Sequence, residues 1–301
     1  VGGMAVVGSA GVVGGIWGEQ GGWSKAAGRQ KKVIGRVRAG ALLCGVLAAV
    51  LGAGAAQIGG GHPGPARWTA FAAAAAAGAV PLLTGQVGRR EVQDWTRLRS
   101  TSEAYKTEVY SFLAGVGPYR STADPAALLR STVNGIRTEA SDLLPHLSGI
   151  DLDGSRPLPA VSDVDSYVEV RLRGQISGYY RPRAAWMHGR LVVVRRTELA
   201  LGLLGVLLAA GSGAFYVEQL AAWVAVVSTV AATLVAYATA AKYEYQELEF
   251  LRTAAELERL LAEWEASSDH GPAAADTLVS RCEHVISVLN DTWMVKWTSE
   301  A

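Results

Sequence analysis

Four long stretches of the sequence carry no charged side chain, and they constrain the fold more than any other feature. They cover residues 39–61, 68–88, 199–217 and 219–241. An α-helix rises about 1.5 Å per residue, so about 20 residues suffice to cross the hydrocarbon core of a bilayer. Each of the four stretches has that length. We therefore predict an all-α membrane protein with four transmembrane helices, in preference to a soluble protein with four buried helices.

The four stretches form two pairs, because only a short loop separates the members of each pair. This spacing favours two antiparallel hairpins. Basic residues are concentrated at the open ends of the hairpins, for example in residues 25–38 and 181–196, whereas the two loops contain one basic residue, Arg67. Positive charge beside a membrane helix favours the cytoplasmic side. We predict a multi-pass protein of the bacterial inner (plasma) membrane with both termini in the cytoplasm.

The chain divides into six segments on this basis. They are a basic cytoplasmic N-terminal segment (1–38), the first transmembrane hairpin (39–88), cytoplasmic helices (89–150), a linker with a membrane-proximal cytoplasmic helix (151–198), the second transmembrane hairpin (199–241) and cytoplasmic C-terminal helices (242–301). The apolar stretch before Glu19 is short and has no basic residue ahead of it, which is atypical of a signal peptide. We expect a flexible or membrane-skimming tail there.

Long helices outside the membrane are expected to form a cytoplasmic bundle. Seven-residue steps place two series of side chains along one helix over residues 91–116: Trp95, Ser102 and Val109, and Leu98, Tyr105 and Phe112. Asp124 ahead of Pro125 is typical of a helix N-cap, and Ser162 with Asp165 fits a capping box. A heptad pattern predicts a seam that joins helices of the bundle or of an oligomer, at Phe250, Leu257, Leu261 and Trp264.

Small residues recur at every fourth position in the membrane stretches, and such faces let helices approach closely. The predicted helix-packing positions are Ala70, Ala74, Gly78, Gly205, Ala209, Gly213, Ala232, Ala236 and Ala240. Thr229, Thr233 and Tyr237 share one face and are candidate pore-lining residues in an oligomer, although such hydroxyls more often bond to their own helix. Pro81 and Pro182 are candidate hinges, because proline interrupts the helical hydrogen bonds.

No catalytic or ligand-binding motif is apparent. The five histidines are scattered, and none stands at metal-ligand spacing from a cysteine, a carboxylate or another histidine. Cys44 and Cys282 lie in different kinds of sequence and are expected to remain unbridged. No Asp, Glu, Lys, Arg or His lies inside the four stretches, which argues against a pump or secondary transporter. We predict a non-enzymatic protein with no catalytic, cofactor-binding or metal-binding residues.

Several segments together resemble the SLATT superfamily, the SMODS- and SLOG-associating two-transmembrane effector domains, in their actinobacterial tandem form. The segments are "WGEQGGWSKAAGRQKKVIGRVRAGALL", "DWTRLRSTSEAYKTEVY", "YVEVRLRGQISGYYRPRAAWMHGRL" and "CEHVISVLNDTWMVKW". The most specific part is the spacing of the family-motif residues ahead of a hairpin, Tyr167, Arg171, Gln175 and Tyr179.

The resemblance implies an effector of anti-phage defence or nucleotide-linked conflict systems that permeabilises the inner membrane when a separate sensor or nucleotide-signalling protein reports infection. We expect an oligomeric, pore-forming or membrane-perturbing protein. Its expected partners are the lipid bilayer and further copies of itself, without nucleic acid. The alternative is a membrane-anchored helical scaffold or sensor that recruits cytoplasmic partners.

Overall fold

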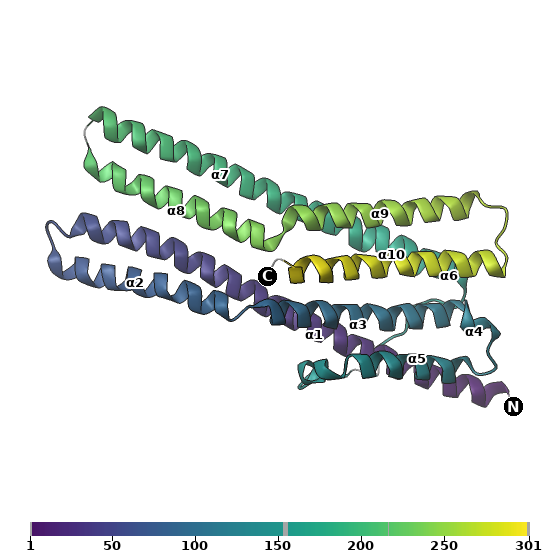
Figure 1. The fold of residues 1–301 in the computed structure, drawn as a ribbon. Helices are drawn as coiled ribbons and strands as arrows, with labels where there is room; N and C mark the ends of the chain where they lie inside the picture. Colours follow the sequence, from purple (N-terminus) through teal and green to yellow (C-terminus); the bar gives the residue numbers. More distant parts are fainter. Residues whose placement is uncertain (1, 153–155, 216, 300–301) are drawn as a thin grey trace. The chain divides into compact units, whose positions relative to one another are not determined.

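The computed structural model describes residues 2–152, 156–215 and 217–299, and the side chains of residues 11–152, 156–215, 217 and 220–287. Within these residues every regular element is helical, which confirms the predicted all-α fold (Figure 1). In chain order the elements are α1 (Gly2–Ile58), α2 (Pro63–Gly85), α3 (Arg89–Ala114), α4 (Pro118–Ser121), α5 (Pro125–Glu139), the 3₁₀ segment η1 (Ser141–Leu147), α6 (Val164–Tyr167), the π-helical segments η2 (Val168–Arg173) and η3 (Ile176–Tyr180), α7 (Arg181–Phe215), α8 (Glu218–Ala241), α9 (Tyr243–Ala266) and α10 (Pro272–Ser299).

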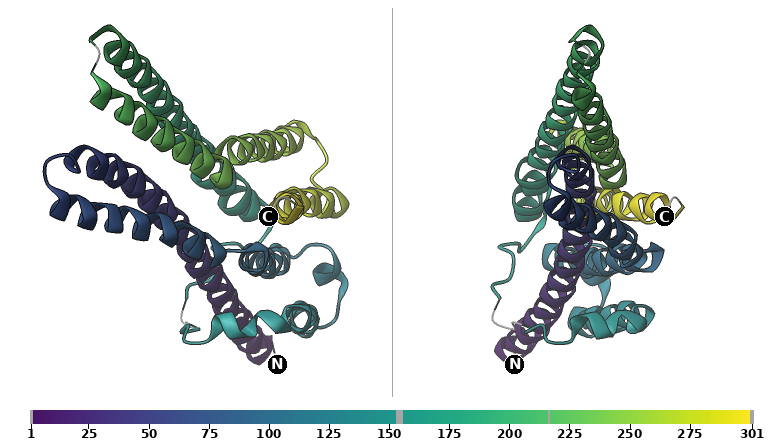
Figure 2. Two further views of the ribbon diagram at one scale, coloured as in Figure 1. Left: turned by 60° about the vertical axis from the view of Figure 1, so that its left-hand side comes forward. Right: turned by 90° about the vertical axis from the view of Figure 1, so that its left-hand side faces the viewer.

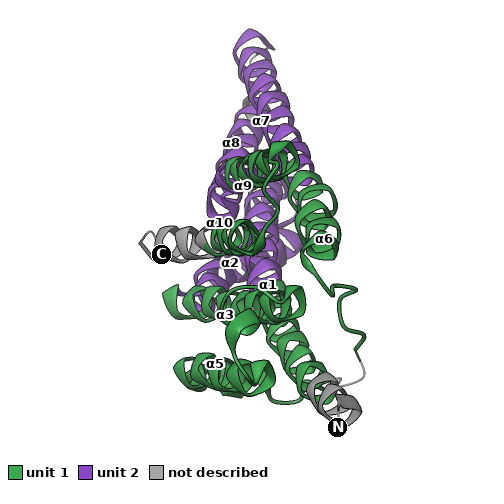
Figure 3. Ribbon diagram, turned by 90° about the vertical axis from the view of Figure 1, so that its right-hand side faces the viewer, with its two compact units in different colours: residues 1–32, 89–184, 248–301 green, residues 33–88, 185–247 purple. Residues whose placement is uncertain are grey.

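The chain forms two compact units, and neither corresponds to one half of the sequence (Figure 3). Unit 1 contains residues 1–32, 89–184 and 248–301, and unit 2 contains residues 33–88 and 185–247. Two helices, α1 and α7, begin in unit 1 and end in unit 2. The predicted boundaries after residues 38 and 198 therefore fall inside continuous helices.

Unit 1 is built around α3, which packs against α5 on one side and α10 on another (Figures 1 and 2). Leu98, Tyr105 and Val109 of α3 are completely buried, and Trp95 and Ser102 are nearly so. The predicted seven-residue pattern is therefore confirmed for these five positions. Burial of large apolar side chains on one face of a helix is the main stabilising term of such a bundle.

The N-terminal part of α1 belongs to this core, so the expected flexible or membrane-skimming tail is wrong for residues 11–20, the part of that segment whose side chains are described. Trp17 and Trp23 are buried, and the Trp17 indole donates to the carbonyl of Pro157 at 3.0 Å. Gly22 permits the closest approach, because a Cβ atom there would lie 2.3 Å from a methyl group of Leu152. Pro157 and Leu152 lie more than 100 residues further along the chain. Local sequence patterns therefore cannot predict these contacts.

Both predicted helix caps are present, one of them at a shifted position. The Asp124 carboxylate accepts a hydrogen bond from the amide of Ala127 at 2.9 Å, as predicted for the start of α5. The second cap is wrong by one residue, since the capping box that starts α6 pairs Asp163 with Ser166 rather than Ser162 with Asp165. Asp163 accepts from the Ser166 amide at 2.8 Å and thereby satisfies one of the free amides at the helix start.

The segment before Pro182 is wound more loosely than an α-helix. It consists of the π-helical η2 and η3, and α7 begins at Arg181. Proline lacks an N–H group and its ring crowds the carbonyl four residues earlier, so a wider turn accommodates it. Pro182 thus lies at the change from π to α geometry, while Pro81 lies within α2. The role of both prolines as hinges stays a prediction.

Unit 2 carries many of its large apolar side chains on the outside. Phe71 is 67% exposed, Leu82 73% and Leu207 70%, whereas small residues such as Ala66 and Ala73 are buried. This is the reverse of the distribution in unit 1. Lipid solvates apolar side chains, so an apolar exterior is typical of membrane helices.

Three helical runs in the described part of the chain are long and apolar enough to cross a membrane: Gly11–Ile58, Pro63–Gly85 and Leu220–Ala266. The chain is accordingly a membrane protein with three candidate spans. The remaining predicted span, residues 199–217, is helical as far as Phe215 in α7 but is not among these three. The arrangement of four spans in two hairpins therefore stays a prediction.

The core of unit 1 predicts a large difference between two leucine-to-alanine substitutions. Leu98→Ala leaves a cavity at a completely buried site and should lower the free energy of unfolding by about 2–5 kcal/mol. Leu144→Ala, at a position that is 43% exposed, should change it by less than about 1 kcal/mol. Tryptophan fluorescence of the detergent-purified protein during urea unfolding measures both values. Equal effects of the two substitutions would contradict the described core.

Candidate functional site

The four family-motif residues occupy the segment from the end of α6 to the end of η3 and form two groups. Tyr167 and Arg171 point into the interior of unit 1, where both bind Glu283 of α10. Gln175 and Tyr179 line a cavity on another side of the same segment. The structure therefore brings these residues together in pairs rather than in one site.

A buried ion pair is the centre of the first group. Arg171 is 1% exposed and Glu283 is 3% exposed. The Arg171 guanidinium donates twice to the carboxylate, from Nε to Oε1 at 2.9 Å and from Nη2 to Oε2 at 2.8 Å. This bidentate geometry is the strongest arrangement that arginine makes with a carboxylate.

Neighbouring side chains complete the hydrogen bonding of Glu283. The Tyr167 hydroxyl donates to Oε1 and the Thr107 hydroxyl donates to Oε2, each at 2.9 Å. The Tyr110 ring lies 4.5 Å from the guanidinium carbon of Arg171. Each carboxylate oxygen thus accepts two hydrogen bonds, and the cation also contacts an aromatic face.

The charged state of this pair is the stable one. Burial by itself raises the pKa of Glu283 and lowers that of Arg171. The charge of the partner and the hydrogen bonds outweigh burial, so the pKa of Glu283 lies below its ordinary value and that of Arg171 lies well above it. Burial and the Glu283 charge raise the pKa of Tyr167, which therefore acts as a neutral hydrogen-bond donor.

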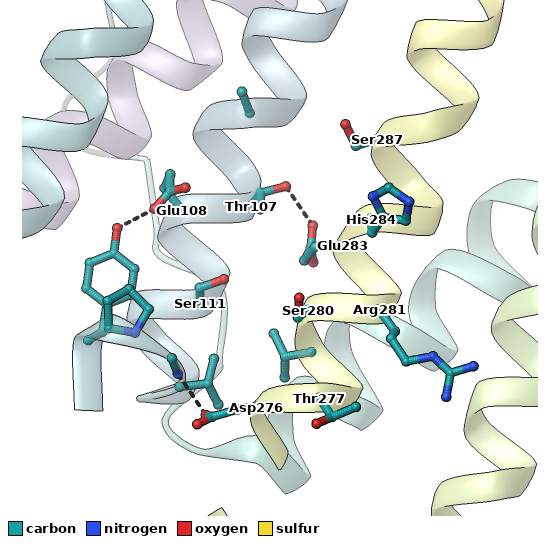
Figure 4. Close-up of a pocket in the computed structure, with 16 residues that line it drawn as sticks. Thr107, Glu108, Ser111, Asp276, Thr277, Ser280, Arg281, Glu283, His284 and Ser287 are labelled. Atoms are coloured by element: carbon teal, nitrogen blue, oxygen red, sulfur yellow. Dashed lines mark hydrogen bonds between the residues drawn. The ribbon is translucent and has the colours of Figure 1, made fainter. Parts of the chain in front are cut away.

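A cavity of about 720 Å³ opens beside Glu283, between α3 and α10 (Figure 4). Its polar lining comes from one helix on each side: Thr107, Glu108 and Ser111 on α3, and Asp276, Ser280, Arg281, His284 and Ser287 on α10. The volume suits a small organic molecule.

The carboxylates around this cavity are already engaged by the protein. Glu108 accepts a hydrogen bond from the Tyr119 hydroxyl, and Asp276 accepts one from the Gly117 amide at 2.7 Å. Glu283 belongs to the buried pair. Within the described residues, no group of three or more histidine, cysteine, aspartate or glutamate side chains is arranged to hold a metal ion. The carboxylates of this cavity therefore take part in contacts that hold the protein together.

The predicted heptad seam lies partly inside unit 1. Phe250 and Leu257 are buried, and the Phe250 ring packs against Tyr179 with the ring centroids 6.0 Å apart. Leu261 and Trp264 are half-buried. The first two positions therefore make contacts within one chain, and a role of the seam in an oligomer stays a prediction.

The predicted helix-packing positions lie mostly on the outer surface of unit 2. Among them Gly205 is half-buried, and a Cβ atom there would lie 3.8 Å from a methyl group of Val227. The others are exposed: Ala70, Ala74, Gly78, Ala209, Gly213, Ala232, Ala236 and Ala240. Contacts within the chain use Ala66 and Ala73 of α2 instead. Packing between chains stays the prediction for the exposed faces.

The candidate pore-lining threonines bond to their own helix. The hydroxyls of Thr229 and Thr233 donate to the carbonyls of Ala225 and Thr229 at 2.8 and 2.7 Å. Thr233 also faces α1, because a Cβ atom on Gly45 would lie 3.2 Å from its methyl group. The Tyr237 hydroxyl is 3.5 Å from that of Tyr243. Whether these three residues line a pore stays a prediction.

Glu283 is not among the residues predicted from the sequence, although it is the centre of the site. One signal does point to it. On α10 the buried positions Val279, Cys282 and Ile286 form an apolar stripe, and Glu283 stands on that stripe. An acidic residue on an apolar helix face needs a buried cation as partner.

Removing one member of the buried pair should be more damaging than removing both. Glu283→Leu leaves the Arg171 charge buried without a partner, which should cost about 3–5 kcal/mol of unfolding free energy. Arg171→Met combined with Glu283→Leu should recover most of that loss. Urea unfolding followed by tryptophan fluorescence measures the free energy of unfolding of each variant.

Arg173→Met is the control, because Arg173 makes only surface ion pairs and its loss should cost less than about 1 kcal/mol. The low pKa of Glu283 adds a pH dependence. The contribution of the ion pair to the free energy of unfolding should be at its full value above pH 4.5, the ordinary pKa of a glutamate, and should decline as the pH falls below that value. A double variant less stable than Glu283→Leu would contradict the described geometry.

Comparison with known proteins divides the chain into two matched regions. Residues 167–293 match the family model described as "SMODS and SLOG-associating 2TM effector domain 1", and residues 22–127 match one described as "Protein of unknown function (DUF4231)". Comparisons with curated proteins and with solved structures each found no match. The first matched region begins at Tyr167 and contains Arg171, Glu283 and the helices α7 and α8. The chain therefore carries, in residues 167–293, a SLATT domain of the SMODS- and SLOG-associating two-transmembrane effector family.

Proposed function

We propose that the protein is a non-enzymatic, oligomeric effector of the bacterial inner membrane that perturbs the membrane in an anti-phage or nucleotide-signalled defence system. The apolar exterior of unit 2 is the observation that carries this proposal. Side chains such as Phe71, Leu82 and Leu207 are more than 65% exposed, and they lie in stretches, residues 68–88 and 199–217, that contain no charged residue. Water does not stabilise such a surface, whereas a bilayer does.

The proposed topology has four spans in two hairpins with both termini cytoplasmic. Residues 199–215 are helical and uncharged, and at about 1.5 Å per residue they extend about 25 Å, close to the thickness of the hydrocarbon core. Exposed Leu199, Leu203 and Val206 support a lipid-facing position for this segment. Arg195 and Arg196 precede it and favour a cytoplasmic start.

Oligomerisation is proposed through the exposed faces of small residues. Ala232, Ala236 and Ala240 are exposed at four-residue spacing on α8. Close packing between such faces is a common mode of helix association in membranes. A separate sensor or nucleotide-signalling protein would then act on unit 1, from which α1 and α7 continue without a break into unit 2.

The alternative of a scaffold that recruits partners through the heptad seam has less support. Phe250 and Leu257, two of the four seam residues, are already buried within the chain. A partner would need to displace these interior contacts. The membrane-perturbing function uses surfaces that are exposed.

The topology predicts which loops can be labelled from outside the cell. In a Cys44→Ser, Cys282→Ala background, single cysteines are placed by Gly60→Cys, Gly213→Cys, Ser121→Cys and Ser268→Cys and treated with a membrane-impermeant maleimide. With four spans, positions 60 and 213 should react in intact spheroplasts, and positions 121 and 268 only after lysis. If residues 199–217 do not span, positions 213 and 268 exchange their behaviour, which would contradict the two-hairpin topology.

Overproduction of the protein should depolarise the inner membrane and arrest growth, as measured with a potential-sensitive dye. Ala236→Trp should abolish depolarisation by blocking the α8 face, because a large side chain prevents close helix approach. Val235→Trp is the matched control, since Val235 is also exposed but lies next to the small-residue face. Unchanged membrane potential with fully inserted wild-type protein, or equal behaviour of the two variants, would count against the proposal.

A further inference from the structure

A second cavity in unit 1, of about 280 Å³, is rimmed by positive charge. Three separate segments supply the cations: Lys31 from α1, Arg99 and Lys106 from α3, and Arg183 from the start of α7. The acidic side chain in the lining is Glu103. The rim therefore carries more positive charge than its carboxylate can neutralise.

Glu103 is already engaged by other cations. Its carboxylate is 2.8 Å from Lys106 Nζ and 3.8 Å from Arg171 Nη2. In the part of the chain that the structure describes, Lys31 and Arg183 take part in no ion pair. Their charges face the cavity without a compensating anion from the protein.

Aromatic rings hold these cations in place. Lys31 Nζ lies 5.7 Å from the centroid of the Trp95 ring. The guanidinium groups of Arg99 and Arg183 lie 6.0 and 5.7 Å from the centroid of the Tyr179 ring, and Arg99 also donates to the Tyr179 hydroxyl at 2.9 Å. The cations are thus positioned before any ligand arrives, which lowers the entropic cost of binding one.

The ionisation of Lys31 reflects this crowding of like charges. Partial burial, together with the positive charges of Arg99 and Arg183, lowers the pKa of Lys31 to about 8. An anion bound among Lys31, Arg99 and Arg183 would raise the pKa of Lys31 again.

We propose that this cavity binds a phosphate-bearing anion of about the size of a nucleoside monophosphate or of a phospholipid headgroup. Three cations from three segments match a group with several charged oxygens, and arginine in particular suits the geometry of phosphate. The Trp95 and Tyr179 rings supply apolar surface for the rest of the ligand. A soluble phosphate ester and the headgroup of an anionic lipid share this chemistry. The inference concerns binding alone and does not depend on the proposed membrane-perturbing activity.

Binding would link α1, α3 and the start of α7 through one ligand. These segments now bring like charges together at the cavity, so an occupied site should stabilise unit 1. The first test is isothermal titration calorimetry of the full-length protein in detergent, with AMP and inorganic phosphate as probes. The second compares thermal unfolding in nanodiscs of phosphatidylcholine with and without phosphatidylglycerol.

Two double variants with the same change in net charge distinguish the cavity from general attraction. Lys31→Ala with Arg183→Ala removes two cations of the rim. Lys32→Ala with Arg181→Ala removes two exposed cations that lie one and two residues from them in sequence and do not line the cavity; Arg181 makes a surface ion pair with Glu258. Circular dichroism and gel filtration establish that both variants fold.

The rim variant should bind at least tenfold more weakly than the control variant. Saturable binding of AMP or phosphate that follows this pattern supports a soluble ligand. Stabilisation by phosphatidylglycerol alone, with the same pattern, supports a lipid headgroup. Absence of both effects, or equal losses in the two double variants, would overturn the proposal.

The pH dependence gives a further readout. The charged and titratable side chains that face Lys31 from the packed segments are Arg99, Glu103, Lys106, Tyr179, Tyr180 and Arg183. Affinity should fall as the pH rises from 7 to 9, through the pKa of Lys31 at about 8, because the anion binds the protonated ammonium group more tightly. Lys31→Ala should remove most of this dependence. A wild-type affinity that does not change over this range would contradict the role of Lys31.

Discussion

The ion pair between Arg171 and Glu283 is closed off from water, and it joins α10 to η2 in the interior of unit 1. Removing two charges from water costs several kcal/mol for each ion unless the geometry and the hydrogen bonding are complete. Here both carboxylate oxygens accept two hydrogen bonds, and the donors come from η2, the end of α6 and α3. Such a site tolerates one arrangement of these helices and penalises others. The site thus joins α3 from the first half of the sequence to η2 and α10 from the second half.

The two units place their apolar residues in opposite ways. Unit 1 buries Leu98, Tyr105 and Leu257 and exposes charged side chains, as a protein in water does. Unit 2 buries alanines and exposes phenylalanine and leucine, which suits a lipid environment. The same chain thus contains two structures adapted to different solvents, joined by the unbroken helices α1 and α7. These helices provide a covalent route by which a change in one unit can reach the other.

The cavity beside Glu283 and the cavity beside Lys31 differ in the charged groups that line them. At the cavity beside Glu283, Glu108 and Asp276 already accept hydrogen bonds from other groups of the protein. That cavity therefore belongs to the structural contact between α3 and α10. At the second cavity, Lys31 and Arg183 have no anionic partner in the described structure, so a ligand can complete the charge balance. The cations of the second cavity come from α1 and α7, which continue into unit 2, and from α3, which directly follows it in sequence. Lys31 and Arg183 lie within two residues of the points at which α1 and α7 pass from unit 1 into unit 2.

Local patterns in the sequence determined the all-α fold, the uncharged helices, the buried face of α3 and the Asp124 cap, because each depends on residues within a few turns of one another. Tertiary structure decided the features that depend on distant partners. Trp17 and Trp23 are buried by residues far along the chain, and Glu283 acquires its role only when Arg171 is brought beside it. Arg171 and Tyr179 belong to one predicted motif, yet Arg171 binds Glu283 in the interior whereas Tyr179 lines the second cavity. Periodicity reports which face of a helix is apolar, whereas the identity of the group that meets that face is decided by long-range packing.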